Sequence, residues 1–192
     1  METRYLRAAL LAALLPLAGT TLAADVINTL DSYAPRQAEV GQQLWQKPEL
    51  GYLEHASSAL LQRELQQAGF HIQANVAGMP TAFVASFRNG SKGPVIGLLA
   101  EMDALPGMAQ AATPVRGVIA GQDAGQACGH NLFGAASVGA ARALAQWMQQ
   151  TGTPGEVRLY GTPAEEGGSG KVYMTKAGLF DDVDVVLHWH PS

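Results

Sequence analysis

The chain has 192 residues, of which 47% are hydrophobic and 15% charged. This is enough apolar material for one ordinary core, so a disordered or low-complexity chain is excluded. The 12 Lys and Arg against 16 Asp and Glu give a net charge of −4 without a basic run, which argues against a nucleic-acid-binding protein. A single cysteine excludes an internal disulfide framework.

The N-terminus has the pattern of a secretory signal peptide. Two arginines precede an apolar run over residues 8–18, and small residues follow it. The run is too short for a comfortable bilayer span, and the small residues favour cleavage after Ala23 over an N-terminal membrane anchor. We therefore expect a signal peptide over 1–23 and an exported, periplasmic mature chain over 24–192, without stable membrane insertion.

Helix and strand patterns alternate along the rest of the chain. In chain order they predict a helical segment over 26–45, a helix over 55–68, strands over 70–76, 81–87 and 94–100, a helix over 131–150, a strand over 156–160, a helix over 171–177 and a strand over 183–189. Pro35 is expected to break the first segment. The almost wholly apolar run 94–100 is typical of a strand buried on both faces. This alternation predicts a layered α/β fold with a mixed, partly parallel sheet.

Polar residues gather at the ends of predicted strands, where ligands bind in open α/β sheets. They lie in the segments 101–107, 161–168 and 188–191, and a further polar segment, 127–131, comes just before the predicted helix over 131–150. Together the segments supply Cys, His, Glu and His side chains, a set of donors that suits a divalent metal ion.

Cys128 and His130 are separated by one glycine, so a thiolate and an imidazole can both face one metal ion. A buried free cysteine beside an ordinary histidine is the simpler alternative. A nucleophilic Cys–His pair fits less well, because neighbours so close in sequence seldom place the base where it activates the sulfur. An exported lone thiol is easily oxidised unless it is buried or bound to metal, which favours ligation.

Glu165 and Glu166 follow a predicted strand directly. They form either a solvated acidic loop or a pair in which one carboxylate binds metal and the other transfers protons. His188 and His190 share one face of the last predicted strand, so either can be a ligand. Asp103 suits a supporting role, in which its carboxylate hydrogen-bonds a ligand and fixes its orientation.

Several of these segments resemble a family of metallo-aminoacylases and carboxypeptidases that includes hippurate hydrolase, the auxin-conjugate amidohydrolases and aminobenzoyl-glutamate hydrolase. They are PELG at 48–51, AEMDALPG at 100–107, ACGHN at 127–131, GTPAEEGGSGK at 161–171 and HWHP at 188–191. They occur in the family's order and span about residues 32–192. The last two most resemble the aminobenzoyl-glutamate hydrolase branch. The resemblance implies an α/β/α zinc-peptidase-like catalytic domain.

The resemblance also implies a role for each candidate residue. The metal ligands that it implies are Cys128, His130, Glu166 and His190. The family's spacing favours His190 over His188 as the last ligand, and the thiolate is able to bridge two ions. Glu165 would be the general base, and Asp103 would support the site. Asn131 stands where many relatives have Asp.

The implied reaction is metal-assisted hydrolysis of the amide bond of N-acyl or N-aroyl amino acids, such as aminobenzoyl-glutamate. The site would hold two divalent ions, which would be zinc or manganese, with cobalt as a further option. The substrate would be a small molecule. A general aminoacylase acting on other conjugates is an alternative.

Relatives continue past the position of Ser192 into a lid or dimerisation domain, through which full-length relatives can form homodimers. They then return to the catalytic domain with a further metal-binding histidine. We therefore expect 24–192 to be the N-terminal part of a catalytic domain that is incomplete at its C-terminus. The non-enzymatic alternative is a truncated, catalytically inactive metal-binding fragment.

Overall fold

A computed structural model of the protein describes residues 18–191, with side chains from Asp25 onward. Most of the predicted signal peptide therefore lies outside the described residues. The helix α1 (Ala18–Gln46) begins before the predicted cleavage position. Across the described part of the chain, no helix combines the length and the apolar character that a membrane span requires.

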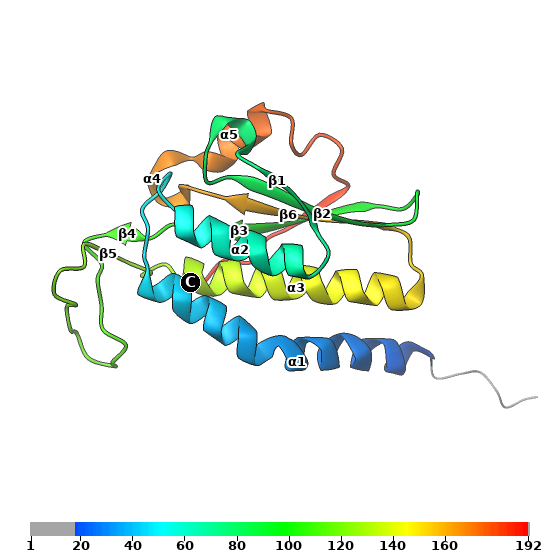
Figure 1. The fold of residues 1–192 in the computed structure, drawn as a ribbon, viewed down its shortest axis with the longest axis horizontal. Helices are drawn as coiled ribbons and strands as arrows, with labels where there is room; N and C mark the ends of the chain where they lie inside the picture. The colour runs from blue at the N-terminus through cyan, green and yellow to red at the C-terminus, as the bar shows by residue number, and fades with distance from the viewer. Residues whose placement is uncertain (1–17, 192) are drawn as a thin grey trace, which may run out of the picture.

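A mixed sheet forms the middle layer of the molecule (Figure 1). Its strands are β1 (His71–Ala74), β2 (Phe83–Asn89), β3 (Val95–Glu101), β6 (Gly155–Thr162) and β7 (Val185–Leu187). The strand order is β1-β2-β6-β3-β7. Strand β3 runs parallel to β6 and β7, whereas β2 runs antiparallel to β1 and β6. The layered α/β fold with a mixed, partly parallel sheet is confirmed.

Helices cover both faces of this sheet (Figure 1). Besides α1 they are α2 (His55–Gln67), α3 (His130–Thr151), α4 (Glu165–Gly168), α5 (Gly170–Lys176) and the 3-10 turn η1 (Val76–Gly78). Helices α2 and α3 pack on one face, and α1 packs on α3 as an outer layer. Helix α5 and η1 lie over the other face. A separate pair, β4 (Leu105–Pro106) and β5 (Ala124–Gly125), was not predicted.

Strand β3 is buried along almost its whole length, as its apolar sequence predicts. Its side chains alternate between the two faces because a strand has a period of two residues. Leu98 and Ala100 belong to the core beneath α2 and α3, whereas Leu99 belongs to the core beneath η1 and α5. Strand β3 therefore contributes side chains to both cores, which fixes the position of the polar residues that follow it.

The prediction that Pro35 breaks the first helix is wrong, because α1 continues through Pro35 to Gln46. A proline inside a helix removes one hydrogen bond and costs about 3 kcal/mol or more. Burial of Val40 and Leu44 on the inner side of α1 offsets this cost. The bend of α1 that is visible in Figure 1 is the usual response of a helix to an internal proline.

Glu64 of α2 joins the three helices on this face, although it is almost fully buried. Its carboxylate accepts hydrogen bonds from Tyr33 Oη at 3.0 Å and Arg36 Nε at 3.1 Å, both on α1. Arg142 of α3 donates to the Glu64 main-chain oxygen at 3.0 Å and lies 4.2 Å from the centre of the Tyr33 ring. Burial alone would raise the pKa of Glu64, but the hydrogen bonds from Arg36 and Tyr33 lower it below its ordinary value.

We expect Glu64→Gln to lower the free energy of unfolding by about 1–3 kcal/mol at neutral pH, because it weakens a charge-assisted hydrogen bond. A carboxyl group whose pKa is lowered by folding stabilises the protein above its unfolded-state pKa. This stabilisation is lost as the pH falls through the folded-state pKa. Urea denaturation of both proteins between about pH 7 and pH 3 should therefore show their difference shrinking on acidification. A difference that is constant across this range would contradict the lowered pKa of Glu64.

We expect Leu61→Ala to lower the free energy of unfolding by about 2–5 kcal/mol, because Leu61 is fully buried in the core beneath α2 and the truncation leaves a cavity. The matched control is Leu132→Ala on α3, whose side chain is 57% exposed. It should change stability by less than about 1 kcal/mol. Denaturant titrations followed by circular dichroism measure both values, and equal losses would contradict the assigned core.

Candidate metal centre

The carboxyl ends of three neighbouring strands meet at one edge of the sheet. Glu101 ends β3 and pairs with Thr162, the last residue of β6. Strand β7 pairs with β3 up to Leu187. Helix α3 begins at His130, which lies 3.0 Å from the Glu101 carboxylate. The parallel register thus brings segments that are far apart in the sequence to one place.

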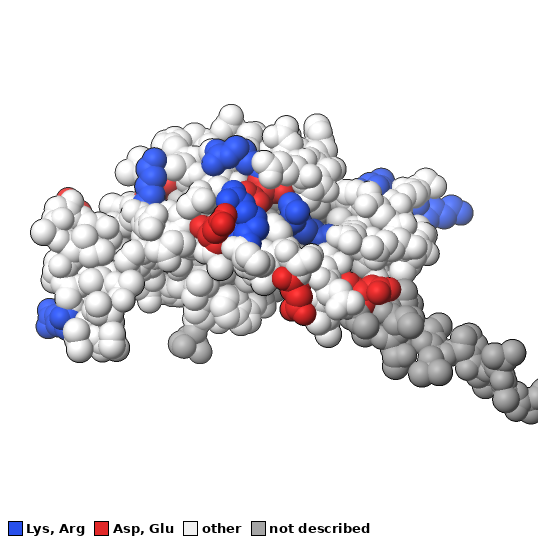
Figure 2. All heavy atoms as spheres, turned by 60° about the horizontal axis from the view of Figure 1, so that its bottom comes forward, with Lys and Arg blue, Asp and Glu red and all other residues white. Residues whose placement is uncertain are grey.

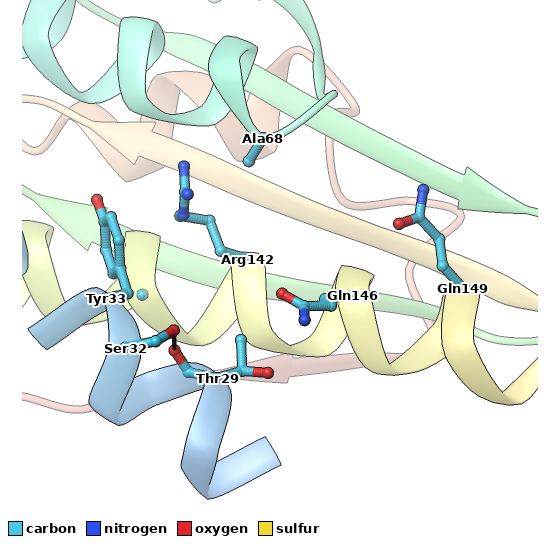
Figure 3. A pocket seen from close by; sticks show the side chains of 8 residues that line it. Thr29, Ser32, Tyr33, Ala68, Arg142, Gln146 and Gln149 are labelled. Atoms are coloured by element: carbon cyan, nitrogen blue, oxygen red, sulfur yellow. Dashed lines mark hydrogen bonds between the residues drawn. The ribbon is translucent and has the colours of Figure 1, made fainter. Parts of the chain in front are cut away.

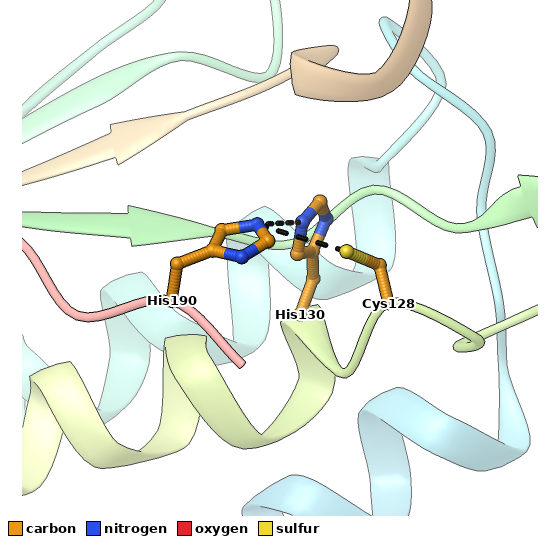
Figure 4. Close-up of side chains that lie close together, drawn as sticks. All are labelled: Cys128, His130 and His190. Carbon is orange, nitrogen blue, oxygen red and sulfur yellow. Dashed lines mark hydrogen bonds between the residues drawn. The ribbon is translucent and has the colours of Figure 1, made fainter. Parts of the chain in front are cut away.

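Cys128, His130 and His190 point toward one another there (Figure 4). His130 Nε2 lies 3.3 Å from His190 Nε2, and His190 Nε2 lies 3.6 Å from Cys128 Sγ. His130 is fully buried, whereas Cys128 is partly buried and His190 is the most exposed of the three. The site is therefore anchored in the core and open to solvent on one side.

These separations fit a shared metal ion. Nitrogen and sulfur donors at about 2.0–2.3 Å from a tetrahedral ion lie about 3.3–3.7 Å from one another. The contacts of His190 with His130 and Cys128, at 3.3 and 3.6 Å, are of this size. A thiolate with imidazoles and nearby carboxylates is also a donor set that divalent transition metals prefer.

Asp103 orients the buried imidazole of His130. The ring Nδ1 lies 2.9 Å from the Asp103 main-chain oxygen and 3.1 Å from its carboxylate Oδ1. Because both oxygens are acceptors, Nδ1 carries a proton and its N–H donates a hydrogen bond to Asp103. Nε2 is the nitrogen that remains to bind a cation, and it faces Cys128 and His190 in the manner expected of a supported metal ligand.

Glu165 and Glu166 open the short helix α4 at the same edge. Glu165 Oε2 lies 3.7 Å from His130 Nε2, and Glu166 Oε1 lies 4.0 Å from it. The Glu166 N–H donates to Asp103 Oδ2 at 2.9 Å. Glu165 forms a second set of mutually close donor atoms with Glu101, His130 and His190. Both carboxylates therefore lie within 4.0 Å of the buried imidazole of His130.

Sequence reasoning missed Glu101, which is 1% exposed. Its Oε1 contacts Lys171 and lies 3.2 Å from His188 Nε2. Its Oε2 lies 3.0 Å from His130 Nε2 without hydrogen-bond alignment, and it has no hydrogen-bond partner among the described residues. A buried carboxylate oxygen without such a partner, at the centre of a cluster of donors, is consistent with a cation there. The sequence did carry a signal for Glu101, because it is a charged residue directly after the apolar run 94–100.

The carboxylates around the cluster control protonation of its donors. Burial alone would lower the pKa of His130, but the hydrogen bond to Asp103 and the charges of Asp103 and nearby Glu101 raise it to about 10. Burial, a contact with Glu166 and the charge of Glu165 raise the pKa of the Cys128 thiol to about 11. A divalent cation reverses these preferences, because it binds thiolate and neutral imidazole and displaces their protons.

The last strand is shorter than predicted, because β7 ends at Leu187. His188 and His190 therefore do not share a face of a regular strand, although their rings are stacked with centroids 5.9 Å apart. Phe133 of α3 packs edge-on against both rings and supports them. His190 contacts Cys128 and His130, whereas His188 contacts Glu101. His190 Nε2 also lies 3.3 Å from Glu101 Oε2, so His190 is the histidine of this pair that lies within the cluster.

A cleft of about 310 Å³ lies elsewhere, between α1, α3 and the end of α2 (Figure 3). It is lined by Thr29, Ser32, Tyr33, Ala68, Gly139, Arg142, Gln146 and Gln149, none of which belongs to the cluster. On the face that Figure 2 shows, acidic and basic side chains are interspersed rather than gathered into a field of one sign. Neither feature competes with the metal-binding cluster as a site for chemistry.

Comparisons with known proteins agree with the geometry. Residues 97–192 match the model of peptidase family M20/M25/M40. The chain is 44% identical over 167 residues to a subunit of the p-aminobenzoyl-glutamate hydrolase of Escherichia coli (strain K12), covering 86% of this chain and 34% of that protein. It is 35% identical to the Xaa-Arg dipeptidase of Homo sapiens, covering 85% of this chain and 37% of that protein.

A solved structure gives the same result for the fold. A Bacillus subtilis protein described as a dinuclear metal-binding peptidase of the M20 family superposes with a TM-score of 0.72 at 26% identity, covering 84% of this chain and 44% of that one. The chain spans 34–41% of the length of the first curated relatives. The resemblance seen in the sequence motifs is confirmed, and the chain belongs to peptidase family M20/M25/M40.

Proposed function

We propose that this protein carries the metal-binding part of an amidohydrolase site, which hydrolyses the amide bond of N-acyl or N-aroyl amino acids. The observation that supports this proposal is the convergence of Cys128, His130 and His190 beside two carboxylates at one sheet edge. Thiolate and imidazole supply metal ligands, and an adjacent Glu supplies proton transfer.

Each residue has one role in the proposal. Cys128, His130, Glu166 and His190 would hold two divalent ions. Asp103 would keep His130 in the tautomer whose Nε2 is free to coordinate. Zinc, manganese and cobalt all accept such a set of donors.

Glu165 would move the proton during hydrolysis. Bound divalent ions supply polarisation of the amide carbonyl and acidify water. The Glu165 carboxylate then accepts a proton from the attacking water and returns it to the leaving amine nitrogen, so that no net proton is consumed at the side chain. Its 35% exposed side chain is accessible to water and to a substrate.

We propose aminobenzoyl-glutamate as the first substrate to test, since the 44% identical relative belongs to an aminobenzoyl-glutamate hydrolase. Because that relative is one subunit of its enzyme, a partner polypeptide for the whole enzyme is also proposed here. Export to the periplasm through the signal peptide over 1–23 is part of the same proposal. General aminoacylase activity on other conjugates is the alternative that a substrate comparison tests.

We expect the protein to retain zinc after desalting and both Cys128→Ser and His190→Gln to lose at least about tenfold in zinc affinity. The matched control is His71→Gln, which removes an exposed histidine on β1. It should bind zinc as the unchanged protein does. Elemental analysis and competition with a chelator measure these affinities. A folded protein that retains no zinc would contradict the proposed site.

We expect the zinc- or manganese-loaded protein to release glutamate from aminobenzoyl-glutamate, and Glu165→Gln to slow this release about 100-fold or more while metal is retained. The amide of Gln has the size of the carboxylate but cannot accept the proton. Assays of glutamate release, with other acyl amino acids in parallel, separate the two substrate proposals. Metal binding without any turnover would favour the inactive-fragment alternative.

A further inference from the structure

We propose that Glu54 is a positioning residue, which holds the loop that carries Glu165 and Glu166 against the metal centre. This inference rests on the proposed function, because it concerns how that site is assembled. Glu54 is fully buried and lies at the N-terminus of α2, far in sequence from the loop that it contacts. Its carboxylate hydrogen-bonds Thr81 and Ala164 and, among the described residues, no proposed ligand, so it would act through the backbone.

Glu54 connects two separate segments of the chain. Its Oε1 accepts a hydrogen bond from the main-chain N–H of Ala164 at 2.8 Å. Its Oε2 accepts a hydrogen bond from Thr81 Oγ1 at 2.8 Å. All three residues are buried, so solvent does not replace either bond if the carboxylate is removed. The Ala164 N–H would be left without a partner immediately before Glu165.

The Glu54 carboxylate can bond to the loop because another residue, Glu49, caps helix α2. A residue at the start of a helix commonly uses its side chain to accept the first N–H groups, but Glu54 makes no such hydrogen bond. The Glu49 carboxylate instead accepts from the N–H groups of Ala56 at 3.0 Å and Ser57 at 2.8 Å. Glu49 of the PELG segment, which precedes α2, therefore caps the helix, and the Glu54 carboxylate can bond to the loop instead.

The loop needs such support because its backbone is strained. Ala164 has φ 54° and ψ 44°, a left-handed conformation that is unfavourable for a residue with a Cβ. Gly51 packs against it so closely that a Cβ on Gly51 would lie 2.8 Å from the Ala164 Cβ. Tyr52 Oη donates a hydrogen bond to the Gly168 oxygen at the end of α4. The segment around Glu54 thus contacts the loop on both sides of the Glu pair.

Asp103 holds the same loop from the metal side. The N–H of Glu166 donates to Asp103 Oδ2, two residues after the N–H that Glu54 accepts. Glu165 lies between these two fixed N–H groups, so its main chain is held in place while its side chain remains accessible. A buried carboxylate on each side therefore positions the proposed base and the proposed ligand.

The test compares Glu54→Leu with Glu54→Gln in the full chain. Leucine removes the acceptor, whereas the Gln side-chain oxygen can still accept the Ala164 N–H. Glu64→Leu is the matched control, because it also removes a buried carboxylate with hydrogen bonds but lies away from the loop. Two measurements are made: amide hydrogen exchange over 161–170 without metal, and Co²⁺ affinity from its visible absorption.

We expect Glu54→Leu to accelerate exchange in the loop at least about tenfold and to weaken Co²⁺ binding about 10–100-fold. Glu54→Gln should stay within about threefold of the unchanged protein in both measurements. Glu64→Leu should lower stability without either change. Wild-type exchange and Co²⁺ affinity in Glu54→Leu would overturn the proposal, as would equal effects of Glu64→Leu.

If the Glu54→Leu protein does not fold, the Thr81→Val variant is used to test the proposal. This variant removes only the hydroxyl that orients Glu54, and it should accelerate exchange in the loop, whereas unchanged exchange would overturn the proposal. If the unchanged protein binds no Co²⁺, the proposed function fails. The exchange measurement on the metal-free protein still decides whether Glu54 holds the loop, so the two failures are distinguishable.

Discussion

The parallel pairing of β3 with β6 and with β7 is the constraint on which the candidate site depends. Parallel strands need a connection that crosses back over the sheet, and their carboxyl ends then lie at the same edge. The connection from β3 to β6 includes α3, whose first residue, His130, lies beside the end of β3. The segments after β6 and β7 deliver Glu165 and His190 to the same place. Slipping either pairing by a residue would separate the donors.

Buried carboxylates are the second feature that defines the site. Asp103, Glu101 and Glu54 are all nearly inaccessible to solvent, and burying a charge is costly unless it is paired. Each has specific partners: an imidazole for Asp103, Lys171 for Glu101, and a hydroxyl with a backbone N–H for Glu54. The same bonds that satisfy these charges hold the surrounding loops and rings in position. Stability and assembly of the metal centre are therefore coupled in this fold.

The chain belongs to the M20 family and spans 34–41% of the length of its first curated relatives. The chain holds a set of close nitrogen, sulfur and carboxylate donors at one sheet edge. Strand β7 is an edge of the described sheet, and its Val185, Val186 and Leu187 side chains are about half exposed. The proposed metal binding would depend on this cluster alone, whereas the proposed turnover would also require that a substrate be bound and oriented.

Apolar periodicity and local motifs along the chain were enough to predict the layered α/β class, the burial of β3 and the residue types of the candidate site. The sequence could not predict that α1 continues through Pro35, because this depends on the packing of Val40 and Leu44 against residues that are distant in the sequence. Nor could it single out Glu101 or Glu54. Each acquires its role from partners that are far away in sequence, and only the tertiary structure brings them within hydrogen-bond distance.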